Sequence, residues 1–172
     1  MMVHQNPVFI PGPTNMPEEV RKACYMPTID HRSPIFGGIL NPCLENVFSR
    51  HHRIAEGVRA AVGAWGLKLC ALSPDVYSDT VSAIRTPEGF DANHIVSHAA
   101  NVYGVALGTG LGEVAGKVFR IGHLGSLTDV MMLSGLATVE MCLADLGLDV
   151  TLGSGVAAAQ DYYRTNPAVS VR

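Results

Sequence analysis

The chain has 172 residues, which is enough for one domain with a buried core. Its formal net charge of −3 and the lack of any Lys/Arg cluster argue against a nucleic-acid-binding surface. No apolar run approaches the roughly 18 residues of a membrane-spanning helix, and no export signal is evident, so we expect a cytoplasmic protein whose four cysteines are reduced. Only 16% of the residues are charged, which suggests surface that a partner covers.

The first forty residues are expected to form an extended arm rather than a domain, because six prolines interrupt them. Within the arm, only Pro17–Tyr25 is predicted to be helical. Pro17 suits a first helical turn, and Glu18 and Glu19 suit the positive end of a helix. Such an arm buries little surface by itself, so it needs another surface to lie on.

The clearest predicted helix covers residues 44–64. Apolar side chains recur at the i, i+3, i+4 and i+7 spacing from Leu44 to Val62, and Gly66 ends the pattern. His51 lies on the apolar side of this helix. We interpret it as a hydrogen-bonded histidine at the edge of the core rather than a metal ligand, because no second ligand lies one turn away on that face.

The remaining elements alternate between strands and helices. Helix 128–146 is apolar nearly all round, so we expect one side to pack on the sheet and the other on helix 44–64 or on a partner chain. The order predicts an α+β fold, in which helices cover one face of a small, four-stranded, mostly antiparallel sheet. The predicted strands are 67–72, 80–85, 105–107 and 118–121, and the further helices are 91–103, capped by Asp91, 128–146 and 155–164.

Two short patterns resemble binding motifs but lack essential parts. His94 and His98 have the spacing of a two-histidine metal site, yet Ile95 stands where the catalytic glutamate would be, so a solvated helix face is favoured. The glycine-rich residues 108–117 fail the phosphate-loop pattern and no helix follows them directly, so we expect a flexible, hairpin-like loop.

The segment Lys117–Gly125 places a single arginine, Arg120, inside an apolar strand. A buried guanidinium is costly unless an anion meets it, and it can grip a carboxylate through two parallel hydrogen bonds. Arg120 therefore either holds the carboxylate of a small acid or points to solvent through the alternation of the strand. From spacing alone we favour the solvent, because one arginine is not a motif.

Several stretches resemble the class V aminotransferases that depend on pyridoxal phosphate, specifically the serine–, alanine– and aspartate–glyoxylate group. Lys117–Gly125 is similar to their substrate-arginine segment, and Leu44–Tyr163 resembles their carboxy-terminal small domain throughout. The amino-terminal signatures resemble residues 6–15 and 30–34 of this chain. With this resemblance, we favour carboxylate binding by Arg120 over its simple exposure to solvent. The resemblance implies a substrate-binding role for Arg120, Gly12, Pro13 and Thr14.

The resemblance divides the chain into an arm at residues 1–43 and a small domain at residues 44–172, and the family's large domain is missing between them. That large domain carries the pyridoxal phosphate and its Schiff-base lysine. The only lysines here are Lys22, Lys68 and Lys117, and none stands in the family's Ser-x-Lys-Gly context. We therefore expect no cofactor, no metal and no catalytic residue in this chain.

Three functions remain open at this stage. The chain could be an inactive remnant of an enzyme that transfers an amino group from serine, alanine or aspartate to glyoxylate. It could be one half of a split aminotransferase that a separate large-domain chain completes. It could also be a non-catalytic module for dimerisation or small-acid binding. The expected partners are a second copy or a large-domain chain, together with a small amino or keto acid.

Overall fold

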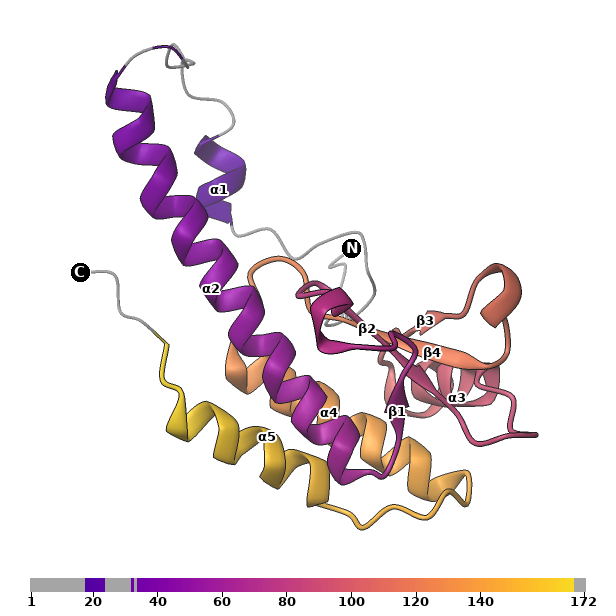
Figure 1. Cartoon of the computed structure of the whole chain (residues 1–172). Coiled ribbons are helices and arrows are strands. Elements are labelled where there is room, and N and C mark those ends of the chain that lie inside the picture. Colours follow the sequence, from indigo (N-terminus) through magenta and orange to yellow (C-terminus); the bar gives the residue numbers. More distant parts are fainter. Residues whose placement is uncertain (1–17, 24–31, 33, 169–172) are drawn as a thin grey trace, which may run out of the picture.

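The computed structural model describes residues 18–23, 32 and 34–168. Their elements follow the predicted order of helices and strands (Figure 1). The helices are α1 (Glu18–Ala23), α2 (Pro34–Ala64), α3 (Asn93–Tyr103), α4 (Asp129–Asp145) and α5 (Ser154–Thr165), and the strands are β1 (Lys68–Leu69), β2 (Val81–Arg85), β3 (Gly108–Thr109) and β4 (Val118–Gly122).

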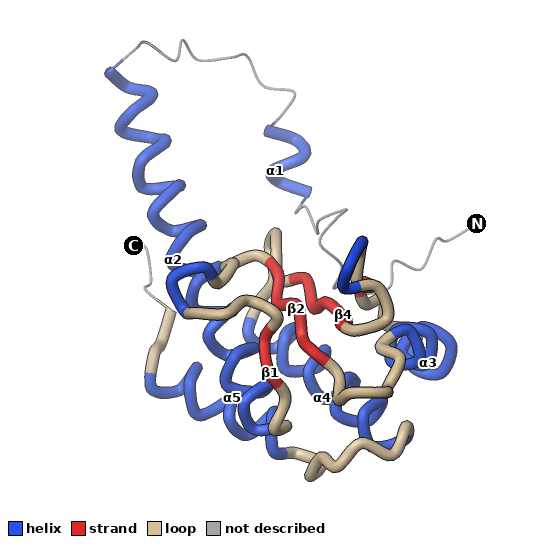
Figure 2. Tube along the Cα trace, turned by 45° about the vertical axis from the view of Figure 1, so that its right-hand side comes forward, coloured by secondary structure: helices blue, strands red, loops and turns tan. Residues whose placement is uncertain are grey.

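The four strands form one antiparallel sheet in the order β1-β2-β4-β3. Helices α2, α4 and α5 lie behind the sheet in Figure 2, and α3 packs on β3 and β4. Strand alternation sends Ile84, Phe119 and Ile121 into the core beneath these helices. The predicted α+β fold with a four-stranded sheet is therefore confirmed, and none of the described α-helices covers the opposite face of the sheet.

Helix α2 is longer than predicted, since it begins at Pro34 rather than near Leu44. Proline is well suited to a first helical position, where no backbone donor is needed. Pro42 lies inside the helix, and the helix continues through it in spite of the lost donor. The prediction that only Pro17–Tyr25 would be helical within the first forty residues was therefore wrong, although α1 falls inside that range.

Two of the strands differ from their predicted bounds by more than one residue. The third strand was expected at 105–107 but pairs at Gly108 and Thr109, because Gly104 ends α3 in a left-handed conformation and Val105 still bonds back to that helix. The first strand was expected at 67–72, but β1 covers only Lys68–Leu69. The loop expected at 108–117 includes β3 and a short 3₁₀ turn at Gly112–Val114.

The helical layer is held together by buried side chains from several helices. In α3, Ile95 and Ala99 are buried, whereas Val102 is 57% exposed. Helix α4 packs on α5, α3 and α2, so the expected contact with helix 44–64 is present. Thr128 caps α4, because its side chain accepts a hydrogen bond from the backbone N–H of Met131.

Helices α2 and α5 approach one another closely at Gly57. A Cβ at this position would lie 2.2 Å from the ring of Tyr163, so only glycine leaves room for that ring. The Tyr163 hydroxyl donates to the Ile54 carbonyl at 3.0 Å, and the Arg53 guanidinium lies 4.9 Å from the centre of the same ring. Burial raises the pKa of the Tyr163 hydroxyl, so the tyrosine is neutral at ordinary pH. The contact between its ring and Arg53 therefore joins a neutral group to a cationic one.

Candidate functional site

Arg120 lies in β4, on the face of the sheet that faces away from the helices. Its neighbours across the strands are Ala83 on β2 and Gly108 on β3, and both are small. Its Nε donates to the Thr109 carbonyl at 2.8 Å, which fixes the plane of the guanidinium. No carboxylate within the described part of the chain pairs with it. Both nitrogens at the end of this side chain therefore remain available for an anion.

The loop that follows β4 is anchored to α2 by two hydrogen bonds at Gly125. Arg50 Nη2 donates to the Gly125 carbonyl at 3.1 Å, and the Gly125 N–H donates to His51 Nε2 at 3.0 Å. His51 is 6% exposed, and its Nδ1 donates to the Val47 carbonyl at 2.7 Å. The interpretation of His51 as a hydrogen-bonded histidine at the core edge is thus confirmed, and the histidine holds the loop after β4 against α2.

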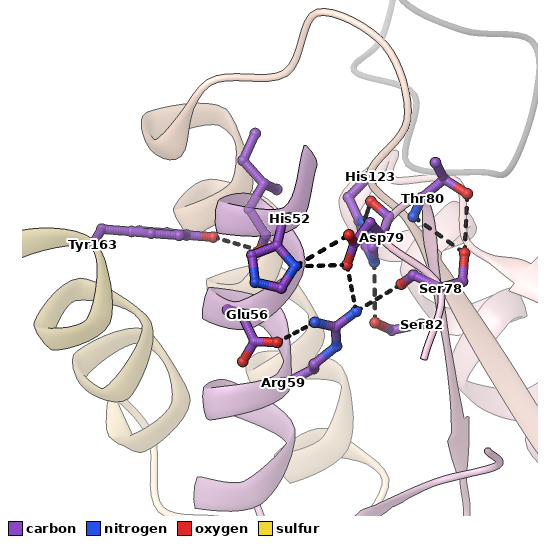
Figure 3. A network of polar contacts seen from close by, with 10 residues as sticks. His52, Glu56, Arg59, Ser78, Asp79, Thr80, Ser82, His123 and Tyr163 are labelled. Atoms are coloured by element: carbon purple, nitrogen blue, oxygen red, sulfur yellow. Dashed lines mark hydrogen bonds and ion pairs between the residues drawn. The ribbon is translucent and has the colours of Figure 1, made fainter. Parts of the chain in front are cut away.

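A polar network joins α2 to the turn before β2 (Figure 3). Arg59 forms ion pairs with Glu56 and with Asp79, where Nη2 lies 2.8 Å from the aspartate oxygen. His52 Nδ1 lies 3.1 Å from the other carboxylate oxygen. Burial acts to raise the pKa of Asp79, but the hydrogen bonds from Arg59 and His52 outweigh it and lower that pKa. Asp79 is therefore ionised at neutral pH and ties two elements together.

His123 is fully buried between this turn and β2. Its Nδ1 donates to the Asp79 carbonyl at 3.0 Å, so Nε2 of the neutral ring accepts from the Ser82 hydroxyl, also at 3.0 Å. Burial lowers the pKa of His123 to about 4, which keeps the ring neutral near pH 7. His123, which follows β4, thereby joins that strand to the turn before β2 and to β2 itself.

A serine beside a neutral histidine is also the arrangement of an activated nucleophile. Here Ser82 is only 3% exposed and His123 is fully buried, so a substrate cannot reach the hydroxyl. We assign the pair a structural role, because it joins β2 to the residue that follows β4. The sequence did not reveal these residues, and its only signal was a histidine directly after the apolar strand β4.

The described residues do not provide a site for pyridoxal phosphate. A Schiff-base lysine works from a desolvated pocket, where its pKa falls. All three lysines, Lys22, Lys68 and Lys117, are exposed. Their surroundings therefore do not fit the cofactor that the resemblance implies.

The described residues show neither a metal site nor a helix that could span a membrane. That part contains no group of three His, Cys, Asp or Glu residues placed to hold a metal ion. His98 instead bonds to Asp145 at 2.8 Å, and His94 lies exposed on the same helix. None of the described helices is long and apolar enough to cross a bilayer. Gly12, Pro13 and Thr14 lie outside the described residues, so their substrate role stays a prediction.

Comparison with known proteins places these features in a family. No protein-family model matches the chain. It is 73% identical over 132 residues to L-aspartate–glyoxylate aminotransferase of Paracoccus denitrificans, and the match covers 77% of this chain and 33% of the relative. Serine–glyoxylate aminotransferase of Hyphomicrobium methylovorum is 57% identical over 127 residues, which are 74% of this chain and 31% of the relative. The chain thus spans about a third of the length of these curated relatives.

Solved structures agree with the sequence matches. Pyridoxamine–pyruvate aminotransferase of Mesorhizobium loti superposes with a TM-score of 0.69 at 32% identity, over 76% of this chain and 34% of that one. Ureidoglycine–glyoxylate aminotransferase of Bacillus subtilis gives a TM-score of 0.67 at 26% identity, over 75% of this chain and 33% of that one. Sequence and fold therefore lead to one conclusion: over about three quarters of its length, the chain is homologous to one part of the aminotransferases that include the aspartate–glyoxylate and serine–glyoxylate enzymes.

Proposed function

We propose that this chain supplies the carboxylate-binding side of a class V aminotransferase that transfers an amino group from an amino acid to glyoxylate. The observation that carries the proposal is Arg120, which stands on the open face of the sheet without a described acidic partner. It also lies in the segment that resembles the substrate-arginine segment of the family. The amino donor in our proposal is aspartate or serine, the donors named for the most similar relatives described above.

The role of Arg120 follows from the geometry of its guanidinium. Thr109 holds Nε, and the two terminal nitrogens can donate parallel hydrogen bonds to one carboxylate. The residues opposite Arg120 on the two neighbouring strands, Ala83 and Gly108, are small, so their side chains do not themselves block the guanidinium. Arg120 therefore binds and orients the acid, and the chain performs no chemistry on it.

We propose further that the chain does not catalyse transamination alone, because none of its three lysines fits the cofactor. The arm at residues 1–43 and the small domain at residues 44–172 remain our proposed division, and helix α2 crosses that boundary. A large-domain chain that carries the Schiff-base lysine, or a second copy, is the proposed partner, and the cytoplasm is the proposed location.

Reconstitution tests this proposal. The large domain of the Paracoccus relative would be expressed as a separate chain and mixed with this one, and amino transfer from aspartate to glyoxylate would be measured with pyridoxal phosphate present. We expect activity only in the mixture, and we expect Arg120→Ala to abolish it. The control is Arg164→Ala, which removes an exposed arginine of α5. Turnover by this chain alone, or full activity of the Arg120 variant, would contradict the proposal.

A non-catalytic dimerisation module is a second candidate function. It is favoured by the exposed apolar side chains on the first half of α2, which have no described partner helix, namely Leu40, Leu44, Val47 and Phe48. If the reconstituted mixture is inactive and the chain self-associates through these residues, this second function is the better description.

A further inference from the structure

A hollow of about 540 Å³ lies where α2, α4 and α5 come together. Its wall is made by the middle of α2, the first turn of α4 and the end of α5, and these three helices pack together behind the sheet (Figure 2). Pockets that hold small ligands have volumes of about 300–1,000 Å³. Arg120 does not line this hollow, so it is separate from the proposed carboxylate site on the sheet.

Much of the wall is apolar. Leu127, Val130, Tyr162 and Pro167 line the hollow, and the side chain of Val130 is 76% exposed. A ligand that covers such side chains removes apolar surface from water, and each methylene group that it buries strengthens binding by about fourfold. The wall therefore favours a ligand with a hydrocarbon part.

Arg50 gives the wall a positive charge that the described residues do not balance. Its Nη2 donates to the Gly125 carbonyl at 3.1 Å, and no carboxylate of the described chain forms an ion pair with it. Its Nε is buried and has no hydrogen-bond partner among the described residues. A partly buried cation without an anion is unfavourable, so a negatively charged group in the hollow would stabilise this side chain.

The second arginine of the wall is already balanced. Arg53 forms an ion pair with Asp129, and its other nitrogens donate to the backbone carbonyls of Tyr163 and Asn166. No other charged residue lines the hollow, so its net charge comes from Arg50 alone. The hollow therefore complements a molecule that has one negative charge and an apolar body.

We propose that this hollow binds a small amphipathic monocarboxylic acid. The carboxylate lies at Arg50, and the hydrocarbon chain lies along Leu127 and Val130. The proposal does not depend on the role of Arg120. Because Arg50 also holds the Gly125 carbonyl, the bound acid and the loop after β4 share one side chain.

Calorimetric titration of the 172-residue chain with three probes tests the proposal. Hexanoate has the proposed chemistry, hexylammonium has the same chain with the opposite charge, and butyrate has the same charge with two methylene groups fewer. We expect hexanoate to bind at least tenfold more tightly than hexylammonium, because only a carboxylate accepts from Arg50. We expect it to bind about fifteenfold more tightly than butyrate. Hexanoate that binds no more tightly than either probe would overturn the proposal.

Matched variants locate the binding. Arg50→Gln should weaken hexanoate binding about tenfold, whereas Arg164→Gln removes an exposed arginine of α5 and should leave it unchanged. Because Arg50→Gln also releases the Gly125 carbonyl, Ser49→Phe provides a second test. Ser49 is exposed and lines the hollow, so a ring at this position fills part of the space and should also weaken binding. If both Arg50→Gln and Ser49→Phe bind hexanoate like the original chain, the acid binds elsewhere and the proposal is wrong.

Nuclear magnetic resonance separates this site from the one at Arg120. Hexanoate should shift the Nε–H signal of Arg50 at lower concentration than the signal of Arg120. If the Arg120 signal shifts first, the acid binds on the sheet, so the hollow proposal falls and the proposed role of Arg120 stands. Hexanoate binding that is lost when the chain is concentrated into dimers would show that a second copy fills the hollow, and would also overturn the proposal.

Discussion

Trp65 and Glu140 form a buried hydrogen bond that connects the end of α2 to α4. The indole Nε1 donates to the carboxylate at 2.8 Å, and Glu140 is only 2% exposed. The same carboxylate accepts the backbone N–H groups of Gly153 and Gly155 at the start of α5. Burial acts to raise the pKa of Glu140, but the indole and these N–H groups outweigh it and lower that pKa. One ionised side chain thus joins three helices.

Glu140→Gln should lower the free energy of unfolding by roughly 2 kcal/mol, because hydrogen bonds to a charged group are lost and the new amide directs a donor at backbone donors. Urea denaturation followed by tryptophan fluorescence measures the change. Glu113→Gln, in the exposed turn before β4, is the control and should stay within about 0.5 kcal/mol of the original chain. An equal effect of both substitutions would contradict the role of Glu140.

Stability should fall as the pH drops from about 6.5 to about 4. His123 has a pKa of about 4 in the folded chain and near 6.5 when unfolded, so the unfolded state binds the extra proton within that window. The stabilisation is fully present above the window and is lost through it, and its size is roughly 3 kcal/mol. Thermal melts between pH 4 and 8 measure the slope.

His123→Gln should melt lower at pH 8 and should flatten that slope, because the group that titrates is removed. His94→Gln serves as the control, since His94 is exposed and makes no buried hydrogen bond. If the slope between pH 4 and 6.5 is the same in the His123 variant, another group is responsible.

The isolated chain should form no specific internal aldimine with pyridoxal phosphate. Its three lysines are exposed and none lies in a desolvated pocket, so no defined absorbance band of an internal aldimine should develop. Borohydride reduction followed by peptide mass spectrometry tests this. A stoichiometric adduct at one lysine, against trace labelling of the other two, would be the contrary result.

The chain should self-associate through the first half of α2. Leu40, Leu44 and Val47 continue the face by which Ile54 packs in the core, and Phe48 beside them is 64% exposed. Glu45 is the single charged residue of residues 34–48, so two copies can meet there with little repulsion. Light scattering should show dimers or larger species.

Phe48→Glu should shift this equilibrium toward monomer by placing a charge in the apolar contact. Leu72→Glu is the matched control, because Leu72 is 93% exposed but lies in the loop after β1. A monomer at high concentration in the unsubstituted chain, or equal effects of the two variants, would count against association through α2.

Arg120→Ala should change glyoxylate affinity of the isolated chain by less than about fivefold, because an exposed ion pair contributes little. We expect binding weaker than millimolar in both forms, since a millimolar ligand already needs about 4 kcal/mol. Calorimetric titration measures it. A tight site that the substitution abolishes would show that this chain holds a complete pocket.

The order of elements could be predicted because apolar periodicity distinguishes helices from strands and because glycines mark their ends. The open-face position of Arg120 also followed from alternation within a strand. The early start of α2 was missed, since two prolines lie within the residues concerned and proline usually ends a helix.

Contacts between distant residues could not be predicted from local pattern. Ser82 and His123 meet only because β2 and β4 pair in one register, and a shift of one residue would turn Ser82 to the other face. Lys68 and Arg85 likewise become neighbours only through the pairing of β1 with β2. Sequence spacing carries no information about register between strands, so both arrangements required the structure.

Helix α2 has a mechanical consequence for ligand binding. Its 31 residues form one continuous helix about 46 Å long, and its first half extends beyond the sheet and helices α3, α4 and α5 (Figure 1). Arg50 and His51, near its middle, hold Gly125 by both backbone groups, five residues after Arg120. A molecule that tilts the first half of α2 therefore also moves the Gly125 loop. Binding far from the sheet can in this way change the position of Arg120 relative to a bound acid.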